Sequence, residues 1–191
     1  TEPLRVAWSA EKNKPTATDI PAKELVGQGI PPWYAYHLAE VQRFYLDRLK
    51  VPRDAFRFAE LDERERAFYN KIHFDVQVNQ DSLGGFREVG GVHYRTDYDL
   101  KGHQAISKVA QSVTVGTKKV LPHVLELSFG VDRNVWALLD LTYAKTDRVV
   151  LRLPPRLAPI STAVFPLVSK DGLPEHAEGL QATLRRSVRT F

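Results

Sequence analysis

The segment Ile72–Asn79, "IHFDVQVN", alternates strictly between apolar and polar side chains. The apolar positions are Ile72, Phe74, Val76 and Val78, and the polar positions are His73, Asp75, Gln77 and Asn79. Successive side chains of a strand point to opposite faces, so this period of two is typical of a strand with one buried face. The segment therefore predicts a half-buried strand in an antiparallel sheet.

The residues that follow predict strand pairing. "NQDSLGG" (79–85) is rich in turn residues and leads into "FREVGGV" (86–92), so 72–93 is expected to form a hairpin. "SVTVGTKKVLPHVLEL" (112–127) predicts another hairpin. Period-two counting places Glu88 on one face with Phe86 and Val92, where an acid turned to the core needs a partner.

Helical spacing marks three segments. In 29–52, apolar residues recur every three or four positions, between the prolines 31–32 and Pro52. This stripe consists of Tyr34, Leu38, Val41, Tyr45 and Leu49. "FAELDERERAFYNK" (58–71) is highly charged and is expected to be a helix with a solvated face, and 131–142 has helical spacing as well.

The two ends of the chain differ from this middle part. Residues 9–21 are polar and contain proline, which predicts a loop or linker. Near the other end, "RVVLRL" (148–153) predicts a short strand and "PPRLAP" (154–159) a break. Residues 161–168 and 174–188 then predict the first strand and helix of an α/β unit, too short to form a stable core alone.

Composition excludes several classes of protein. The 191 residues contain 43% hydrophobic and 26% charged side chains, as expected of a chain that buries a core. There is no cysteine, which excludes disulfides and cysteine-ligated metals. The net charge of +4 permits a nucleic-acid partner without requiring one. No apolar run is long enough to span a membrane, and no Walker-type loop or Ser-His-Asp set can be recognised.

The segment "LPHVLELSFGVDR" (121–133) carries the clearest chemistry. Glu126 and Ser128 share one strand face, and a carboxylate beside a hydroxyl can hold an ammonium group. A helix is expected to begin at Gly130 and Val131, with Arg133 in its first turn, where an anion is attracted. The alternative is a structural ion pair between Glu126 and Arg133 or another arginine. His73 and His93 could meet across the first hairpin, but no metal site is assigned.

Three segments together resemble a known family. They are "REVGGVHYRTDYDLKGH" (87–103), "LPHVLELSFGVDRNVWALL" (121–139) and "LPPRLAPISTAVFPL" (153–167). Their residues and order are similar to those of glycyl-tRNA synthetases of the archaeal and eukaryotic type, which are class II aminoacyl-tRNA synthetases. The second segment resembles motif 3 of that class, and the resemblance extends from about Gln28 to the C-terminus.

The resemblance implies an α+β fold, with a class II synthetase-type antiparallel sheet flanked by helices and followed by an incomplete α/β anticodon-binding unit. It implies a polar lead-in over 1–27, the C-terminal part of the catalytic domain over 28–156, and the start of the anticodon-binding domain over 157–191. It also implies a cytoplasmic enzyme that acts on glycine and tRNA(Gly), uses ATP with Mg²⁺, and is a homodimer in its complete form.

The resemblance also assigns roles to individual residues. Glu126 and Ser128 align with the positions that hold the glycine ammonium group, and Arg133 aligns with the motif 3 arginine that contacts ATP phosphate. Glu88 aligns with a position near the ATP site. Arg95 and Gly130 align with supporting positions. No metal-binding cluster of protein side chains is implied.

Several positions depart from the family pattern. Leu127 replaces the usual proline, His93 a small residue, Tyr94 an Asn or Asp, and Phe68 the usual histidine. No segment resembles motif 1, which forms the dimer interface, or motif 2, which supplies the arginine that binds the α-phosphate. Two hypotheses follow: part of a glycine–tRNA ligase, inactive in isolation, or a non-catalytic binding or scaffolding relative.

Overall fold

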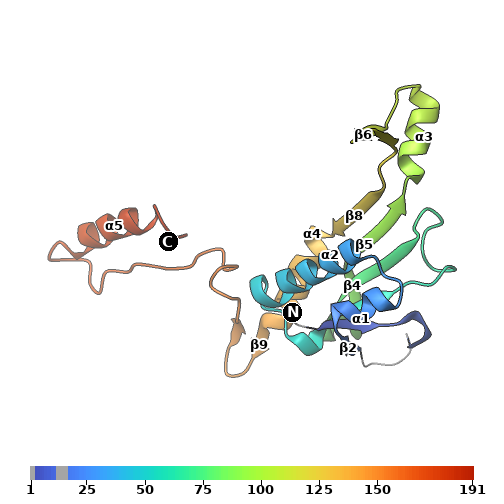
Figure 1. Ribbon diagram of the computed structural model, residues 1–191. Coiled ribbons are helices and arrows are strands. Elements are labelled where there is room, and N and C mark those ends of the chain that lie inside the picture. The colour runs from blue at the N-terminus through green and yellow to red at the C-terminus, as the bar shows by residue number, and fades with distance from the viewer. Residues whose placement is uncertain (1–2, 12–16) are drawn as a thin grey trace. The chain divides into compact units, whose positions relative to one another are not determined.

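The structure is a computed structural model that describes residues 3–11 and 17–191. The chain divides into two compact units, Thr1–Leu141 and Thr142–Phe191. A large sheet with its helices forms the first unit, and the second contains a small hairpin and one helix (Figure 1).

A six-stranded mixed sheet with the order β2-β1-β3-β4-β5-β8 forms the centre of the first unit (Figure 1). The strands are β1 (Leu4–Ala7), β2 (Thr18–Ile20), β3 (Phe56–Glu60), β4 (Ile72–Gln80), β5 (Gly85–Thr96) and β8 (Val124–Phe129). β1 and β3 are parallel, and the other neighbours are antiparallel. The α+β class is confirmed, and the expected antiparallel sheet is corrected to a mixed one because β1 joins it alongside β3.

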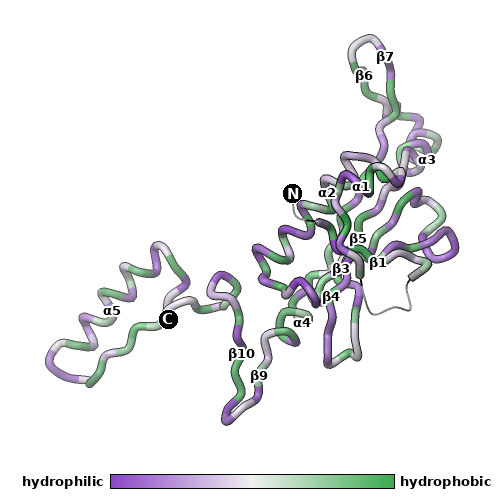
Figure 2. The backbone as a smooth tube through the Cα atoms, turned by 60° about the horizontal axis from the view of Figure 1, so that its bottom comes forward, coloured by the Kyte–Doolittle hydropathy of each residue, from purple (hydrophilic) through white to green (hydrophobic). Residues whose placement is uncertain are grey.

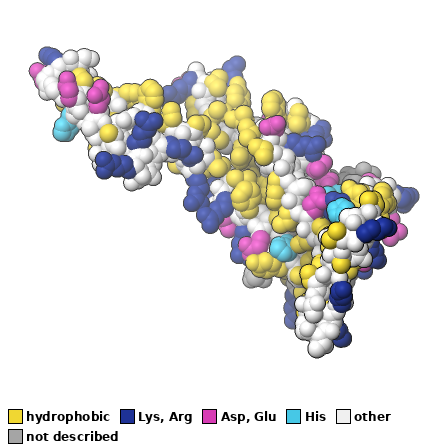
Figure 3. Space-filling model, turned by 90° about the horizontal axis from the view of Figure 1, so that it is seen from above, with side chains coloured by type: hydrophobic (Ala, Val, Ile, Leu, Met, Phe, Trp, Pro, Cys, Tyr) yellow, Lys and Arg dark blue, Asp and Glu magenta, His cyan; other side chains and the backbone are white. Residues whose placement is uncertain are grey.

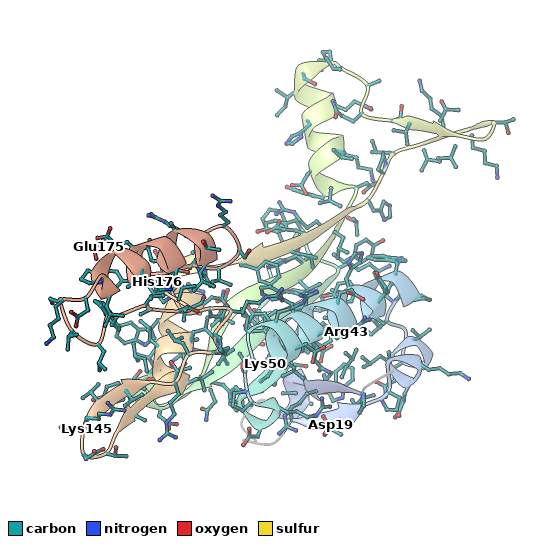
Figure 4. All side chains as sticks on the ribbon, turned by 90° about the vertical axis from the view of Figure 1, so that its left-hand side faces the viewer. Asp19, Arg43, Lys50, Lys145, Glu175 and His176 are labelled. Carbon is teal, nitrogen blue, oxygen red and sulfur yellow. The ribbon has the colours of Figure 1, made fainter. Side chains whose placement is uncertain are left out.

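The N-terminal segment contributes more structure than its sequence predicts. Residues 9–21 were expected to form a loop, but β2 lies within them, and Ile20 is buried in the core. β2 has only three residues, too few for a period-two pattern to be recognised. Residues 12–16 of this stretch lie outside the described part of the chain. Asp19 of β2 forms an ion pair with Arg53 at 2.9 Å (Figure 4).

Two helices, α1 (Ala22–Gly27) and α2 (Pro32–Arg43), pack on one face of the sheet (Figure 1). The predicted stripe of Tyr34, Leu38, Val41 and Tyr45 is confirmed, since all four side chains are buried in the core. α2 passes into a π-helical turn at Phe44–Arg48 before the chain reaches Pro52. Burial of each large apolar side chain stabilises the fold by about 1.5–3 kcal/mol.

The alternation along β4 is confirmed. Phe74, Val76 and Val78 are completely buried on the face covered by α2. The register places His73 of β4 opposite His93 of β5, and Gln77 opposite Glu88. The second face of the sheet therefore carries polar side chains from neighbouring strands, and we call it the polar face.

A β-bulge at Val89 changes the face on which Glu88 lies. Gln77 pairs with Glu88, while Phe74 pairs with Val92. Since cross-strand partners point to the same side, Glu88 shares the polar face with Gln77, and Val92 lies on the apolar face. The prediction that Glu88 and Val92 share a face is therefore wrong, because the bulge inserts one residue into the period-two count.

The charged segment 58–71 was predicted to be helical, but its first residues belong to β3 and the rest is irregular. Phe58 pairs with Val76 of β4 and is completely buried. Pairing and burial of this side chain outweigh the helical preference of the charged residues that follow it.

The segment between β5 and β8 contains α3 (Tyr98–Ser107), β6 (Val113–Val115) and β7 (Lys118–Val120) (Figure 1). β6 and β7 pair with each other around Gly116, which has a positive φ of 62°. The hairpin predicted over 112–127 therefore ends at Val120, and β8 pairs with β5 instead. α4 (Val131–Thr142) follows β8, and Ala137 is its contribution to the buried core.

The second unit contains β9 (Tyr143–Lys145), β10 (Val149–Leu151) and α5 (Leu173–Leu184). β10 fulfils the prediction of a short strand, and α5 ends four residues before the predicted end of its helix. The strand predicted over 161–168 does not form, because only 189–191 lie alongside it. Those contacts comprise a parallel bridge between Thr162 and Thr190 and four backbone hydrogen bonds, three donated by Ser161, Thr162 and Val164 and one donated by Phe191. Hydrophobic and hydrophilic stretches alternate along α5 (Figure 2).

The surface is chemically mixed. On the face shown in Figure 3, acidic, basic and hydrophobic side chains lie among one another. Within the described residues, no helix combines the length and the hydropathy that crossing a membrane requires.

Candidate functional site

Three neighbouring strands bring polar side chains together on the polar face. β4 supplies His73, which pairs with His93 of β5, and His93 pairs in turn with Glu126 of β8. Two residues along the same strands, Gly91 of β5 pairs with Ser128 of β8. The strand alternation thus places Glu126 and Ser128 side by side on this face, as expected from their spacing in the sequence.

Arg95 connects β5 to β8 and to the start of α3. Its Nη1 donates a hydrogen bond to Oε2 of Glu126, and its Nε and Nη2 donate to the two carboxylate oxygens of Asp99, both at 2.8 Å. The ring of Tyr69 lies 4.3 Å from the guanidinium carbon, a cation–π distance. The hydrogen bonds to Asp99 and, to a smaller extent, to Glu126 raise the pKa of Arg95 above its ordinary value. Arg95 in turn holds the pKa of Asp99 below its ordinary value.

These contacts bear on the alternative role of Glu126. The carboxylate forms an ion pair with Arg95 and not with Arg133. The hydrogen bond uses Oε2, so a cationic ligand would approach Oε1. Arg95 thereby fixes the orientation of Glu126, which a binding site and a purely structural pair would both require.

Ser128 contacts a side chain of the neighbouring strand, β5. Its Oγ lies 3.1 Å from Nε2 of His93, whose Nδ1 lies 3.2 Å from the amide nitrogen of Asn70. Asn70 is 5% exposed. Burial, together with the neighbouring His73 ring, lowers the pKa of His93 below its ordinary value. The hydroxyl of Ser128 therefore contacts an imidazole that favours its neutral form.

Arg133 and Glu88 form a second charged group. Nη1 of Arg133 lies 3.0 Å from Oε2 of Glu88, and both side chains are about half exposed. They border a hollow of about 500 Å³. Its lining residues are Gln80, Leu83, Arg87, Glu88, Asp132, Arg133 and Trp136. Three of these are basic or amide side chains, which suit an anionic or polar ligand.

The first turn of α4 is fixed to the bulge in β5. The backbone N–H of Gly130 donates to the carbonyl of Val89 at 3.0 Å, and the side-chain amide of Asn134 donates to the same carbonyl at 2.9 Å. The Tyr45 hydroxyl donates to Oδ1 of Asn134 at 2.7 Å. A Cβ at Gly130 would lie 3.1 Å from Cδ of Arg133, so glycine lets that side chain fold back over the helix start.

The structure thus brings the predicted residues together in two groups, Glu126 with Ser128 and Arg95, and Glu88 with Arg133. At about 3.3 Å per residue, the five steps from Glu88 to His93 separate these groups by about 15 Å along β5. The sequence did not indicate the roles of His93, Asn70 and Asn134 in holding them. His93 carried a signal, since it departs from the family pattern, whereas a buried asparagine outside a strand carries none.

Within residues 3–11 and 17–191, no three His, Asp or Glu side chains gather closely enough to hold a metal ion. The rings of His73 and His93 lie with their centroids 4.0 Å apart and their planes tilted by 42°.

Sequence comparison relates the chain to known proteins. It is 36% identical over 172 residues to the glycine–tRNA ligase of Borrelia garinii subsp. bavariensis, covering 85% of this chain and 38% of that protein. It is 33% identical over 162 residues to the glycine–tRNA ligase of Mesoplasma florum, with 80% and 35% covered. For the glycine–tRNA ligase of Treponema denticola, the values are 33% over 171 residues, with 83% and 37% covered. No protein-family model matches the chain.

The chain is homologous to one part of the glycine–tRNA ligases. This confirms the resemblance to glycyl-tRNA synthetases that the three sequence segments indicate. The chain spans about 38% of the length of the first of these relatives. The homology therefore concerns only a part of the ligase.

Proposed function

We propose that this chain is the part of a glycine–tRNA ligase that holds glycine and ATP for the formation of glycyl-adenylate, from which glycine passes to tRNA(Gly). The observation that carries the proposal is the homology to glycine–tRNA ligases over 85% of the chain. The polar face supports it, because it offers an oriented carboxylate and a hydroxyl on one strand, followed directly by an arginine at a helix start.

In this proposal, Glu126 and Ser128 bind the ammonium group of glycine. The carboxylate supplies the opposite charge, and the hydroxyl oxygen accepts a further hydrogen bond. Arg95 orients Glu126 through its ion pair and is itself held by Asp99. Because Arg95 is already paired, its charge does not repel the incoming ammonium group as a free arginine would.

Arg133 binds phosphate of ATP, which enters with its Mg²⁺. The guanidinium lies at the first turn of α4, where the helix N-terminus adds a partial positive charge. Glu88 positions Arg133 through their 3.0 Å contact. A carboxylate oxygen of glycine forms a bond to the α-phosphorus, and the bond from that phosphorus to pyrophosphate breaks. The aminoacyl group then moves to a hydroxyl of the terminal adenosine of tRNA(Gly), and AMP leaves.

The proposal includes a domain organisation. Residues 28–156 belong to a class II catalytic domain with motif 3, and 157–191 begin an anticodon-binding α/β domain. The complete enzyme is a cytoplasmic homodimer. Since no segment of the chain resembles motif 1 or motif 2, the 191 residues alone are not expected to catalyse glycine-dependent pyrophosphate exchange.

A non-catalytic binding or scaffolding subunit is the second candidate. The observation that favours it is that Glu126 and Ser128 both have partners within the chain, Arg95 and His93. A network that only stabilises the sheet would have the same contacts. Ligand binding separates the two candidates, because only the first requires the polar face to recognise an ammonium group.

The test is calorimetric titration of the purified chain with a non-hydrolysable analogue of glycyl-adenylate, since mimics of reaction intermediates bind more tightly than substrates. The proposal predicts saturable binding that is lost with excess glycine and ATP. If the chain is a non-catalytic scaffold, the analogue should not bind. Glycine-dependent pyrophosphate exchange by the purified chain would contradict the expectation that it is inactive in isolation.

A further inference from the structure

His93 lies at the centre of the polar face, between the two residues proposed to bind the ammonium group. It is the cross-strand partner of Glu126, and its Nε2 lies 3.1 Å from Ser128 Oγ. A Cβ built on Gly91 would lie 2.5 Å from the same Nε2. The imidazole therefore extends over Gly91 to Ser128, and the absent side chain of Gly91 leaves it room to do so.

The contacts of the ring favour one tautomer of the neutral imidazole. The amide nitrogen of Asn70 can only donate, so Nδ1 of His93 is the acceptor in their 3.2 Å contact. The ring proton of the neutral imidazole consequently lies on Nε2, which donates to Ser128 Oγ. This bond occupies one acceptor site of the hydroxyl oxygen and leaves the other to a ligand N–H group.

Protonation of His93 at Nδ1 would disturb its contact with Asn70. A proton on Nδ1 would face the N–H₂ group of Asn70, donor against donor, in a site where Asn70 is 5% exposed. The charged groups around the ring act in opposite directions. His73 and Arg95 oppose a positive charge on it, and Glu126 and Asp75 favour one. Burial is the largest influence and opposes the charge.

We propose that His93 is a positioning residue of the ammonium site: its neutral imidazole holds the Ser128 hydroxyl for the ligand, and protonation of the imidazole opposes ligand binding. This inference rests on the proposed function, because it assigns His93 to the site formed by Glu126 and Ser128. The imidazolium and the ligand ammonium group would be two cations beside one carboxylate, so each excludes the other.

This exclusion makes recognition of the ammonium group dependent on pH. Binding of the ligand and protonation of His93 are linked, so the affinity for an ammonium ligand falls by up to about tenfold for each pH unit below the pKa of His93. A ligand that lacks the ammonium group is not repelled. The difference between two such ligands therefore isolates the effect of His93.

The experiment compares two non-hydrolysable analogues, glycyl-adenylate and acetyl-adenylate, of which the second has a methyl group in place of the aminomethyl group. Calorimetry between pH 5 and 7, where an α-amino group stays charged, gives the preference for the glycyl analogue. The proteins are the wild type, His93→Gln, His93→Ala and His176→Gln. His176 lies exposed on α5 and provides the matched control (Figure 4).

The wild type and His176→Gln should lose preference for the glycyl analogue as the pH falls from 7 to 5 toward the lowered pKa of His93. His93→Gln keeps an N–H donor without a titrating group, so its preference should stay constant and lie within about threefold of the wild-type value at pH 7. His93→Ala should lose about five- to tenfold at pH 7, the equivalent of one hydrogen bond. A profile for His93→Gln that falls like the wild type, or an unchanged preference in His93→Ala, would overturn the inference.

Failure of the proposed function would look different, because then no protein would distinguish the two analogues at any pH, and the inference would fall with it. A second measurement does not depend on folding of the variants. The ¹⁵N resonances of the His93 ring in the ligand-free wild type at pH 7 should show the proton on Nε2. A proton on Nδ1 would overturn the assigned hydrogen bond to Ser128.

Discussion

Oε2 of Glu88 lies 3.0 Å from Nη1 of Arg133, so a strand residue and a helix residue 45 positions apart meet beside the polar face. The bulge at Val89 makes this contact possible, because it turns Glu88 to the polar face and offers its own carbonyl to the start of α4. One inserted residue thus positions both the acid and the arginine.

Arg133→Ala is expected to weaken ATP binding about ten- to a hundredfold and to change glycine affinity by less than about twofold, since a hydrogen bond to a charged group contributes about 1.5–3 kcal/mol. Separate calorimetric titrations of ATP and glycine measure both effects. Arg43→Ala, which removes an exposed partner of Glu40 on α2 (Figure 4), should leave both affinities unchanged. Equal losses for the two ligands would show that Arg133 has a structural role instead.

Gly90→Ala should lower the free energy of unfolding by about 1–3 kcal/mol, the usual effect of overpacking. A Cβ at this position would lie 2.6 Å from the backbone oxygen of Ser128, which cannot move away as a flexible side chain would. Gly102→Ala in α3 is the control, because open space surrounds that position, and alanine there should stabilise the helix by about 0.5–1 kcal/mol. Urea denaturation measures both, and an unchanged midpoint for Gly90→Ala would contradict the close approach of β5 and β8.

Tyr34→Phe should destabilise the fold by about 1–3 kcal/mol. The hydroxyl of Tyr34 donates to the carbonyl of Val92 at 2.7 Å, and the side chain is completely buried, so the substitution removes a hydrogen bond within the core. Tyr36→Phe on the same helix, where the side chain is 58% exposed, should have an effect below about 0.5 kcal/mol. Similar midpoints for the two variants in urea would argue against this hydrogen bond.

Stability should depend on pH through His93. Its pKa in the folded protein is lower than its ordinary value of about 6.5 in an unfolded chain, because burial and His73 disfavour the charge. The unfolded chain therefore binds a proton at a higher pH than the folded protein does. Stability is unaffected above about pH 7 and falls as the pH decreases through 6.5 toward the lowered pKa. His93→Gln should lose less stability between pH 7.5 and 5.5 than the wild type or His176→Gln, and identical losses would refute this assignment.

Period-two alternation was sufficient to predict β4, because the two faces of that strand differ in burial, and the same alternation placed Glu126 and Ser128 on one face of β8. The same counting was wrong for Glu88. The bulge adds one residue to the strand, and the sequence does not show it, because glycines such as those beside Val89 also occur in strands without a bulge. Helical spacing was similarly informative for α2 and the turn after it, where Tyr34, Leu38, Val41 and Tyr45 are buried and Leu49 is partly buried.

Other parts of the structure depend on contacts that a sequence pattern does not encode. β3 forms in a charged segment because Phe58 pairs with Val76, and β2 is too short to show any period. The partners of Glu126 and Ser128 come from β5. Strand register decides that Arg95 and His93 reach them, and register was not available from spacing within β8.

The most direct test of the ammonium site is the preference of Glu126→Gln for glycyl- over acetyl-adenylate analogues, measured by calorimetry at pH 7. The substitution keeps the shape of the side chain and removes its charge. The wild type should prefer the glycyl analogue by about ten- to a hundredfold, and Glu126→Gln should lose most of that preference while binding the acetyl analogue as tightly as the wild type does. If Glu126→Gln retains the wild-type preference, or if the wild type binds both analogues equally, Glu126 serves only its ion pair with Arg95, and the polar face is not an amino-acid site.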